Sequence, residues 1–343
     1  MDDAIFHDPR FRVRRLPEPE IRKDPVVDRW VIVSTDRLGR TQELHAEAPP
    51  SRLHACPFCA GNERLTPQES FAIRDENGWR IRVVPNAFPA LRRVNEFRSL
   101  SQNGFERWSG LGIHEVIIEC PHHESSLANL PAAHLADIFR VYRQRIRAGK
   151  DDPRLIYPMI FKNCGADAGA TLEHAHSQII LMPCVPLIAH EELDGANRFR
   201  EATGRCVFCD LRDREQTAGV RMVCESAEFT AFAAFAGRFP FETWILPKHH
   251  ASHFEEISDA ETDALAEMMR TVLRKLSLGL NDPPYNFYIH SAPLNEPATS
   301  AYHWHIEILP RLTGTAGFEW GTGFAINPVP PEQAAAYLRG VEV

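Results

Sequence analysis

The sequence lacks the features of a membrane or secreted protein. Of its 343 residues, 44% are hydrophobic and 24% are charged. No apolar run reaches the roughly 18 residues that a membrane-spanning helix needs. The N-terminal stretch MDDAIFHDPRFRVRRLP is polar and charged and has no apolar core of a signal peptide. We therefore expect a cytoplasmic globular protein without membrane contacts, long enough for two domains or one duplicated domain.

A dense run of basic residues is also absent. The chain carries 46 acidic and 38 basic residues, for a net charge of −8, and the basic residues are spread along it. Proteins that bind nucleic acid usually gather lysine and arginine on one face to neutralise phosphates. We therefore expect no nucleic-acid partner, although a few local arginines would suffice for a small anionic substrate.

The eight cysteines divide into two groups. Four form two CxxC pairs, Cys56/Cys59 and Cys206/Cys209, which in a chain without a secretion signal indicate metal ligands or redox centres before disulfides. A thioredoxin-like role is not expected, because neither pair precedes a helix in a βαβ context. The other four are expected to be small buried hydrophobic residues: Cys120, Cys164, Cys184 and Cys224.

The order of the motifs indicates an internal duplication. CPFC (56–59), PHHES (121–125), a long amphipathic stretch and HAHSQIILMP (174–183) are followed by CVFC (206–209), PKHHAS (247–252), a second amphipathic stretch and HWHIEILP (303–310). The offset is 150 residues between the CxxC pairs and 129 residues between the HxH motifs. The boundary is predicted in the polar segment near 190–200, which divides the chain into residues 1–195 and 196–343.

Each half is predicted to be an α+β unit, in which one long helix packs on an antiparallel sheet. The first helix is expected over 130–149, and the second begins at Ser258, an N-cap residue with Glu261 three positions later. A short helix is expected over 330–340. The β-rich runs are WVIVS, RIRVVPN, HEVIIEC, YPMIFKN, SQIILMP, ETWILPK, YNFYIHS and HIEILPR.

Two sets of cysteine and histidine residues are predicted to bind structural zinc, because tetrahedral zinc sites take these ligands. The sets are Cys56, Cys59, His123 and His174, and Cys206, Cys209, His250 and His303. The repeat favours the second histidine of each HH pair, although His122 or His249 could take its place. Alternatively, the cysteines are ordinary buried residues and the histidines lie on the surface.

The segment FKNCGADAGATLEHAHSQIIL contains most of the residues that are candidates for catalysis and phosphate binding. The loop from Gly165 to Thr171, which includes Gly169, can bring backbone N–H groups close to a phosphate, and Asn163 adds an amide at its start. In an extended segment His174, His176 and Gln178 project to the same side.

We interpret His176 as a nucleophile towards phosphorus, provided that one ring nitrogen is free and the other donates to a fixed acceptor. Gln178 would donate to the phosphoryl oxygens, with help from Ser177 and the loop amides. The alternative is that His176 is a second metal ligand or a packed core residue.

The second half serves as an internal control. His305 occupies the position of His176, but Ile306 and Glu307 replace Ser177 and Gln178, and a carboxylate there would repel a phosphate. The preceding segment also lacks the FKNxGA start. We therefore predict one catalytic half and one degenerate half, in which His305 lines the site or the core.

The pattern NxGAxxGAxxxHxHxQ, with an upstream CxxC and a degenerate second half ending in HxHxExLPR, resembles the galactose-1-phosphate uridylyltransferase family of the histidine-triad superfamily. The resemblance extends from DPVVDRWVIVSTDR (24–37) to GFEWGTGFAINPVPPEQAA (317–335). It implies a duplicated histidine-triad-like fold, zinc at Cys56, Cys59, His123 and His174, and a homodimer in which residues cross between subunits.

The resemblance also implies roles for individual residues. His176 would take a nucleoside monophosphate from a nucleotide sugar and pass it to a second phosphorylated acceptor in a ping-pong reaction, with Gln178 as the phosphate-binding glutamine. The remaining matches are expected to bind substrate: Arg37 and Arg40 at phosphate, Asn86 near the nucleoside, Asn163 and Thr171 near the diphosphate, and Phe318 and Glu319 at the hexose.

Some features depart from the usual uridylyltransferase. The chain has HAHSQ in place of HPHGQ, lacks a lysine before Phe318, and keeps Cys206 and Cys209 for a second zinc. These differences resemble a divergent branch whose plant members are ADP-glucose phosphorylases.

The leading prediction is a UDP-glucose–hexose-1-phosphate uridylyltransferase with two zinc ions per chain. The alternative within the same chemistry is an ADP-glucose phosphorylase that transfers the adenylyl group to phosphate. A nucleotide hydrolase and a non-catalytic zinc module are further options.

Overall fold

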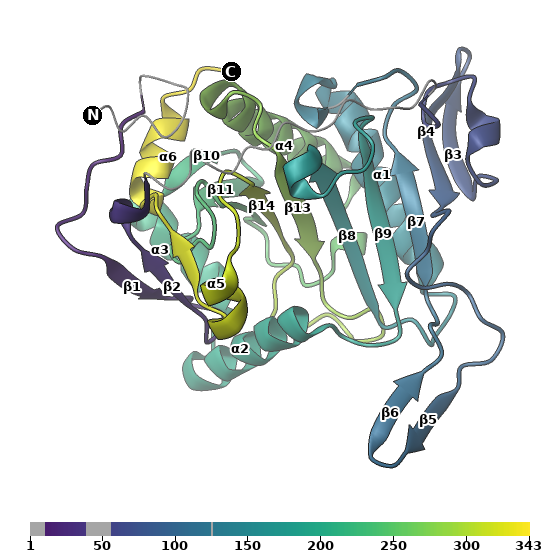
Figure 1. The fold of residues 1–343 in the computed structure, drawn as a ribbon, viewed down its shortest axis with the longest axis horizontal. Helices are drawn as coiled ribbons and strands as arrows, with labels where there is room; N and C mark the ends of the chain where they lie inside the picture. Colours follow the sequence, from purple (N-terminus) through teal and green to yellow (C-terminus); the bar gives the residue numbers. More distant parts are fainter. Residues whose placement is uncertain (1–10, 39–55, 125) are drawn as a thin grey trace.

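The computed structural model describes residues 11–38, 56–124 and 126–343. Its centre is a ten-stranded sheet in which every neighbouring pair is antiparallel (Figure 1). From edge to edge the strands are β10 (Met222–Glu225), β11 (Phe229–Ala233), β12 (Thr243–Pro247), β14 (His305–Pro310), β13 (Tyr285–His290), β8 (Tyr157–Cys164), β9 (His176–Met182), β7 (Ile113–Ile118), β4 (Gly78–Pro85) and β3 (Phe71–Asp75).

The strand order repeats the duplication that the motifs predicted. Five strands come from each half, and they run in the same order from each outer edge to the centre. There β8 pairs with β13, with Phe161 opposite Tyr288, so the two halves share one continuous sheet. The predicted α+β fold is therefore confirmed, and each of the predicted β-rich runs within this sheet forms a strand.

Two long helices cover one face of the sheet. Helix α1 (Ala132–Gly149) and helix α4 (Asp259–Leu280) also pack against each other. The predicted N-cap of α4 is present, because Ser258 and Glu261 form a reciprocal capping box. Leu135, Phe139 and the other apolar residues of both helices are buried in the main core.

The opposite face is covered more fully in one half than in the other. Over the C-terminal half lie α2 (Leu187–Thr203), α3 (Val207–Ala218) and a small sheet of β1 (Glu20–Lys23), β2 (Trp30–Val33) and β15 (Ala325–Asn327), with α5 (Gly317–Thr322) beside it (Figure 1). Apolar residues of α2 and α3 pack on Phe232 and Trp244. Over the N-terminal half, the segment with Cys56 and Cys59 packs Phe58 onto Val84, Val116 and Ile118, and we call the rest of this face of that half the open face.

Helix α2 lies where the polar segment at 190–200 predicted a boundary, so residue 195 falls inside a helix. At this position α2 touches the segment between β1 and β2: a Cβ on Gly195 would lie 1.8 Å from the Val26 carbonyl oxygen. Only a residue without a side chain allows this approach.

The remaining elements lie at the periphery. Helix α6 (Pro331–Arg339) is the predicted C-terminal helix and packs on β10, β11 and α4. A hairpin of β5 (Ser99–Gln102) and β6 (Phe105–Trp108) projects from the body (Figure 1). Within the described ranges, no helix is both long and apolar enough to cross a bilayer.

Candidate active site and metal centres

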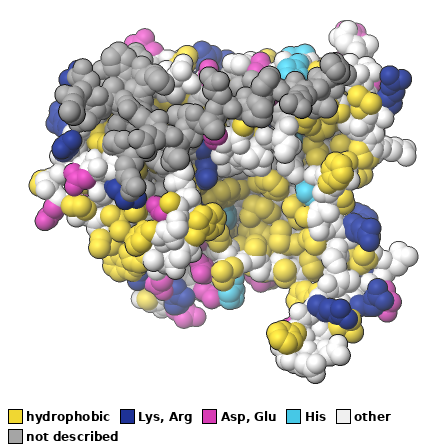
Figure 2. All heavy atoms as spheres, viewed as in Figure 1, with side chains coloured by type: hydrophobic (Ala, Val, Ile, Leu, Met, Phe, Trp, Pro, Cys, Tyr) yellow, Lys and Arg dark blue, Asp and Glu magenta, His cyan; other side chains and the backbone are white. Residues whose placement is uncertain are grey.

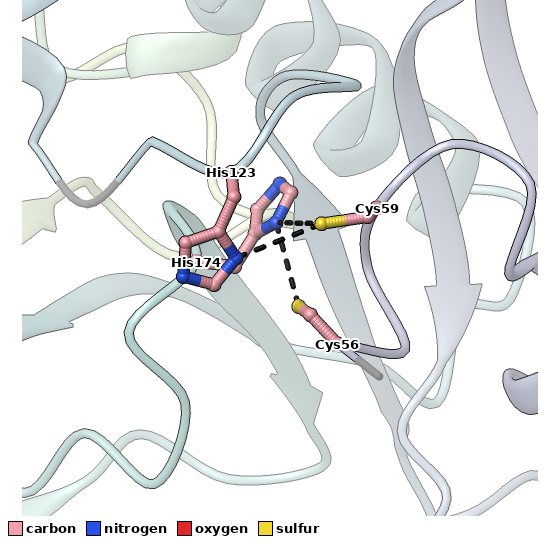
Figure 3. Close-up of side chains that lie close together, drawn as sticks. All are labelled: Cys56, Cys59, His123 and His174. Carbon is pink, nitrogen blue, oxygen red and sulfur yellow. Dashed lines mark hydrogen bonds between the residues drawn. The ribbon is translucent and has the colours of Figure 1, made fainter. Parts of the chain in front are cut away.

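The first predicted ligand set converges on one point (Figure 3). The Sγ atom of Cys56 lies 3.5 Å from Nδ1 of His174, and Sγ of Cys59 lies 3.6 Å from Nδ1 of both His123 and His174. Ligand bonds of about 2.3 Å to sulfur and 2.05 Å to nitrogen give a sulfur-to-nitrogen edge of about 3.6 Å in a tetrahedron. The four residues therefore fit a tetrahedral metal ion.

The surroundings of this set also suit a metal. Nε2 of His174 lies 2.8 Å from the carbonyl oxygen of Cys120, to which it donates, and this leaves Nδ1 free to bind an ion. Burial lowers the pKa of His174 and so favours the neutral ring that metals bind. It is His123, and not His122, that completes the group.

The second set has the same geometry. Sγ of Cys209 lies 3.4 Å from Nδ1 of His250 and 3.5 Å from Nδ1 of His303, and all four ligand atoms, including that of Cys206, lie within 4.8 Å of one another. A hydrogen bond from Cys209 lowers the pKa of the Cys206 thiol to about 7, which favours the thiolate that binds metal. Both sets could hold a metal ion.

Cys206 is the N-cap of α3, so the second CxxC leads into a helix, but the strands that follow this helix pair antiparallel and form no βαβ unit with it. The expectation about Cys184 is wrong. Cys184 is exposed and therefore does not fill the core. Cys120 is buried as predicted, whereas Cys164 and Cys224 are half-buried.

His176 is held as a nucleophile requires. It opens β9, and its Nδ1 lies 2.8 Å from the carbonyl oxygen of His174, to which it donates. Nε2 has no hydrogen-bond partner among the residues that the structure describes. Burial and the nearby charge of Lys162 lower the pKa of His176 and favour the neutral ring. The ring therefore presents an unprotonated Nε2 lone pair.

A buried network fixes this strand from behind. Lys162, which is 1% exposed, donates to Oε2 of Glu119 at 2.5 Å and to the carbonyl oxygen of His176 at 2.9 Å. The hydroxyl of Tyr142 on α1 lies 2.7 Å from Oγ of Ser177. Ser177 thus faces the helices, opposite to His176. The prediction of Ser177 as a substrate ligand is therefore wrong.

Gln178 follows His176 on the open face and contacts a residue of β7 and the residue just after β4. Its Oε1 lies 2.8 Å from Nε2 of His114 and 3.2 Å from Nδ2 of Asn86. Asn86 and Gln178 were both predicted as site residues, and the structure brings them together. His114 was assigned no role, because nothing in the motif HEVIIEC distinguishes it from other residues of a strand.

The glycine loop adopts the conformation that its composition suggests. Gly165 and Gly169 have φ angles of +83° and +85° and flank the short 3-10 helix Ala166–Ala168. Asn286 donates from Nδ2 to Oδ1 of Asn163 at 2.8 Å and to the carbonyl oxygen of Ala168, and so ties the loop to the sheet. Thr171 is exposed at the end of this loop.

A hollow adjoins this site. A cavity of about 650 Å³ lies over β8, β13 and β14 and is lined by apolar residues and by Arg238 and Arg311. Phe161 and Asn163 both line this cavity, and Phe161 lies opposite Gln178 on the neighbouring strand, so the cavity borders the Gln178 group. Figure 2 shows it as a depression with hydrophobic walls near the centre of the face.

Three predicted substrate ligands do not lie beside His176. Arg37 follows β2, and Phe318 and Glu319 belong to α5, where Oε2 of Glu319 accepts from the N–H of Ala316 at 3.1 Å. Both elements lie over the C-terminal half, away from β9 (Figure 1). Arg40 lies outside the described residues. One copy of the chain therefore does not assemble the whole predicted set.

The residue equivalent to His176 in the C-terminal half, His305, is completely buried. His305 is 0% exposed, and its ring lies 4.7 Å from Phe208, 5.1 Å from Trp244 and 4.8 Å from His290. Its Nδ1 approaches the carbonyl oxygen of His303 at 3.2 Å, as in the first half. His176 is 6% exposed and has Phe58 of the first CxxC at 5.3 Å from its ring, so the two histidines differ in the extra rings of Trp244 and His290 that enclose His305.

Sequence reasoning missed a buried ion-paired cluster below α2. Glu192 lies 3.1 Å from Nδ1 of His290, and Glu307 pairs with Arg238. Arg238 also lies 3.2 Å from Oε1 of Glu242. Opposite charge from His290 and Arg238 lowers the pKa values of Glu192 and Glu307, respectively, despite their burial.

The fold and the site together define a nucleotidyltransferase with a duplicated histidine-triad-like fold and one HxH histidine, His176, that is followed by a glutamine. Two family models match the chain: galactose-1-phosphate uridyl transferase, N-terminal domain, over residues 13–186, and C-terminal domain, over residues 192–339. The chain belongs to the galactose-1-phosphate uridyl transferase family, as the motifs indicated.

Several relatives are similar over nearly their whole length. An Arabidopsis thaliana ADP-glucose phosphorylase is 38% identical, over 95% of this chain and 93% of that protein. A Thermotoga maritima galactose-1-phosphate uridylyltransferase is 31% identical, over 94% and 99%. The crystal structure of an Arabidopsis thaliana ADP-glucose phosphorylase with bound ADP-glucose superimposes with a TM-score of 0.82, at 38% identity and over 95% of this chain and 100% of that chain.

Proposed function

We propose that the enzyme transfers a nucleotidyl group from a nucleotide sugar through a covalent intermediate on His176. The observation that carries this proposal is the hydrogen bond from Nδ1 of His176 to the His174 carbonyl, which leaves Nε2 unprotonated. In the first step the Nε2 lone pair attacks the α-phosphorus. The bond from phosphorus to the bridging oxygen breaks, and sugar 1-phosphate leaves. In the second step an acceptor phosphate oxygen attacks the same phosphorus, and the bond from nitrogen to phosphorus breaks.

We further propose ADP-glucose as the donor and inorganic phosphate as the acceptor. This order reverses the leading prediction from the sequence. Three features support it: the higher identity to the ADP-glucose phosphorylase than to the Thermotoga uridylyltransferase, the second CxxC pair, and the missing lysine before Phe318. The products would be ADP and glucose 1-phosphate. Uridylyl transfer between UDP-glucose and galactose 1-phosphate is the second candidate, because the Thermotoga relative carries that name.

Labelled donors distinguish these candidates. The protein is incubated with ADP-glucose or UDP-glucose labelled in the α-phosphate, and protein-bound label is counted before and after acceptor is added. We expect label from ADP-glucose that phosphate discharges as ADP. Label from UDP-glucose that galactose 1-phosphate discharges would favour the second candidate. Steady release of free mononucleotide without acceptor would indicate a hydrolase, and binding without labelling would indicate a non-catalytic module.

We propose that both cysteine and histidine sets hold structural zinc, two ions per chain. The tetrahedral spacing of the donor atoms and their mixture of sulfur and nitrogen support this metal. The residues of the first set come from the segment before β3, the segment after β7 and the residues just before β9, which begins at His176. A zinc ion there would fix the start of β9.

We propose a homodimer in which a second copy completes the site. Arg37, Phe318 and Glu319 lie away from His176, and the cavity beside Gln178 is open and apolar. Mixed dimers test this: His176→Ala and Glu319→Ala subunits, each inactive alone, are expected to recover activity at one of the two sites when combined. No recovery would contradict a shared site.

A further inference from the structure

We propose that His114 is a positioning residue that decides which end of the Gln178 amide faces the reacting phosphate. The inference rests on the proposed function, in which Gln178 donates to phosphoryl oxygens. A glutamine side chain has a donor end and an acceptor end of almost equal shape, so an unconstrained Gln178 could present either. Three linked hydrogen bonds remove this freedom.

The first bond fixes the tautomer of His114. The backbone N–H of Ala90 lies 3.0 Å from Nδ1 of His114, and a backbone N–H can only donate. Nδ1 is therefore the unprotonated nitrogen, and Nε2 carries the proton of the neutral ring.

The second bond follows from the first. Nε2 of His114 lies 2.8 Å from the terminal group of Gln178, and a donor there needs an acceptor, which must be Oε1. The register supports this approach. His114 pairs with Ile180 and Val116 pairs with Gln178 on neighbouring strands, so His114 reaches Gln178 diagonally across the open face.

The third bond comes independently from Asn86. The backbone N–H of Phe88 donates to Oδ1 of Asn86 at 2.8 Å, which turns Nδ2 of Asn86 towards Oε1 of Gln178 at 3.2 Å. Nδ2 of Asn86 also lies 3.1 Å from Nε2 of His114, as expected of two donors that share one acceptor.

Two donors that converge on Oε1 direct the NH₂ group of Gln178 away from them. His176 lies two residues earlier on the same face, so this NH₂ group is available to the phosphoryl oxygens as negative charge develops on them. A donor that is oriented before the reaction stabilises that charge without reorganisation, and loss of one such donor typically costs about 10²–10³ in rate. A flipped amide would instead place Oε1 against the phosphate and repel it.

His114→Leu removes the donor, whereas His114→Gln keeps an N–H donor near the ε position and serves as the matched control. We measure the single-turnover rate at which ADP-glucose labels His176, and the KM, in both variants, in Gln178→Ala and in the double variant. Because Asn86 still holds Oε1, His114→Leu is expected to slow labelling by about tenfold, which is less than the loss for Gln178→Ala. The unfolding midpoint should change little, and His114→Gln should restore most of the rate.

The double variant gives the decisive comparison. If His114 acts through Gln178, the double variant labels as slowly as Gln178→Ala alone, because the effect of His114 disappears with its partner. Multiplicative losses in the double variant, or an unchanged rate in His114→Leu, would overturn the inference.

A measurement independent of catalysis separates this inference from the proposed function. Nitrogen-15 NMR of histidine-labelled enzyme is expected to show the Nε2–H tautomer for His114, and the Nδ1–H tautomer would overturn the inference. If the wild-type enzyme shows no labelling by either nucleotide sugar, the proposed function fails, and the tautomer still tests the hydrogen-bond chain.

Discussion

Replacement of Lys162 by methionine tests the network that supports the nucleophile. Lys162 and Glu119 are 1% and 0% exposed, and Nζ of Lys162 donates both to Glu119 and to the carbonyl oxygen of His176. Methionine has similar volume but no charge and no donor. The variant therefore leaves a buried carboxylate without its cation and a buried carbonyl without its donor.

Removal of one partner of a buried ion pair costs about 3–5 kcal/mol of unfolding free energy. This lowers the ratio of folded to unfolded protein by roughly a hundredfold to several thousandfold. Urea unfolding monitored by tryptophan fluorescence measures the change. The rate of His176 labelling should also fall, because the carbonyl of His176 loses the lysine that holds it.

Two further variants check the reasoning. Lys162→Met combined with Glu119→Gln removes the unpaired charge and should recover most of the lost stability. Lys23→Met breaks an ion pair with Asp28 in which both side chains are exposed, and it should leave the urea midpoint unchanged within error. If Lys162→Met unfolds at the same urea concentration as Lys23→Met, the network does not stabilise the strand as argued.

Four other substitutions have definite expected results. His176→Ala should abolish labelling by a nucleotide sugar. His305→Ala opens a cavity between Phe208 and Trp244, so it should lower stability but retain labelling. Equal loss of labelling in both variants would contradict a single active half. Cys206→Ser should lower zinc content from two ions to one per chain by atomic emission, and an unchanged count would remove the second site. Gly195→Ala should lower the unfolding free energy by about 1–3 kcal/mol, because the added Cβ meets a backbone carbonyl; an unchanged urea midpoint would contradict this close contact.

The parts of the fold that could be predicted from sequence depend on local patterns. The helical spacing of Leu135, Ile138 and Phe139 and the cap at Ser258 indicated α1 and α4, because each pattern is complete within a few residues. The repeated order of motifs indicated the duplication. It did not indicate that the two halves share one sheet, because the pairing of β8 with β13 joins residues about 120 positions apart.

The candidate site was predictable where chemistry follows spacing. His176 and Gln178 alternate along β9, and their shared face follows from that alternation. Ser177 was misplaced, although the same alternation puts it on the other face, because the motif suggested a hydroxyl at the phosphate. His114 could not be recognised, since its role depends on the N–H of Ala90 and on the register between β7 and β9.

The surroundings of His305 were only partly predicted, because it was expected to line either the site or the core. The segment that forms α2 is polar, and its helical pattern is weak beside that of α1. Without α2 and α3, nothing in HWHIE indicates that His305 is enclosed by aromatic rings. The difference between the halves therefore comes from what packs on the sheet, in addition to the replacement of Gln178 by Glu307 at the equivalent position.

The central claim is that His176 carries the nucleotidyl group. Intact-protein mass spectrometry after incubation with ADP-glucose in the absence of phosphate, followed by peptide mapping at neutral pH, tests it most directly. We expect one adenylyl group per chain, located on His176, absent in His176→Ala and lost when phosphate is added. An adduct on another residue, or no adduct from either ADP-glucose or UDP-glucose, would contradict the account.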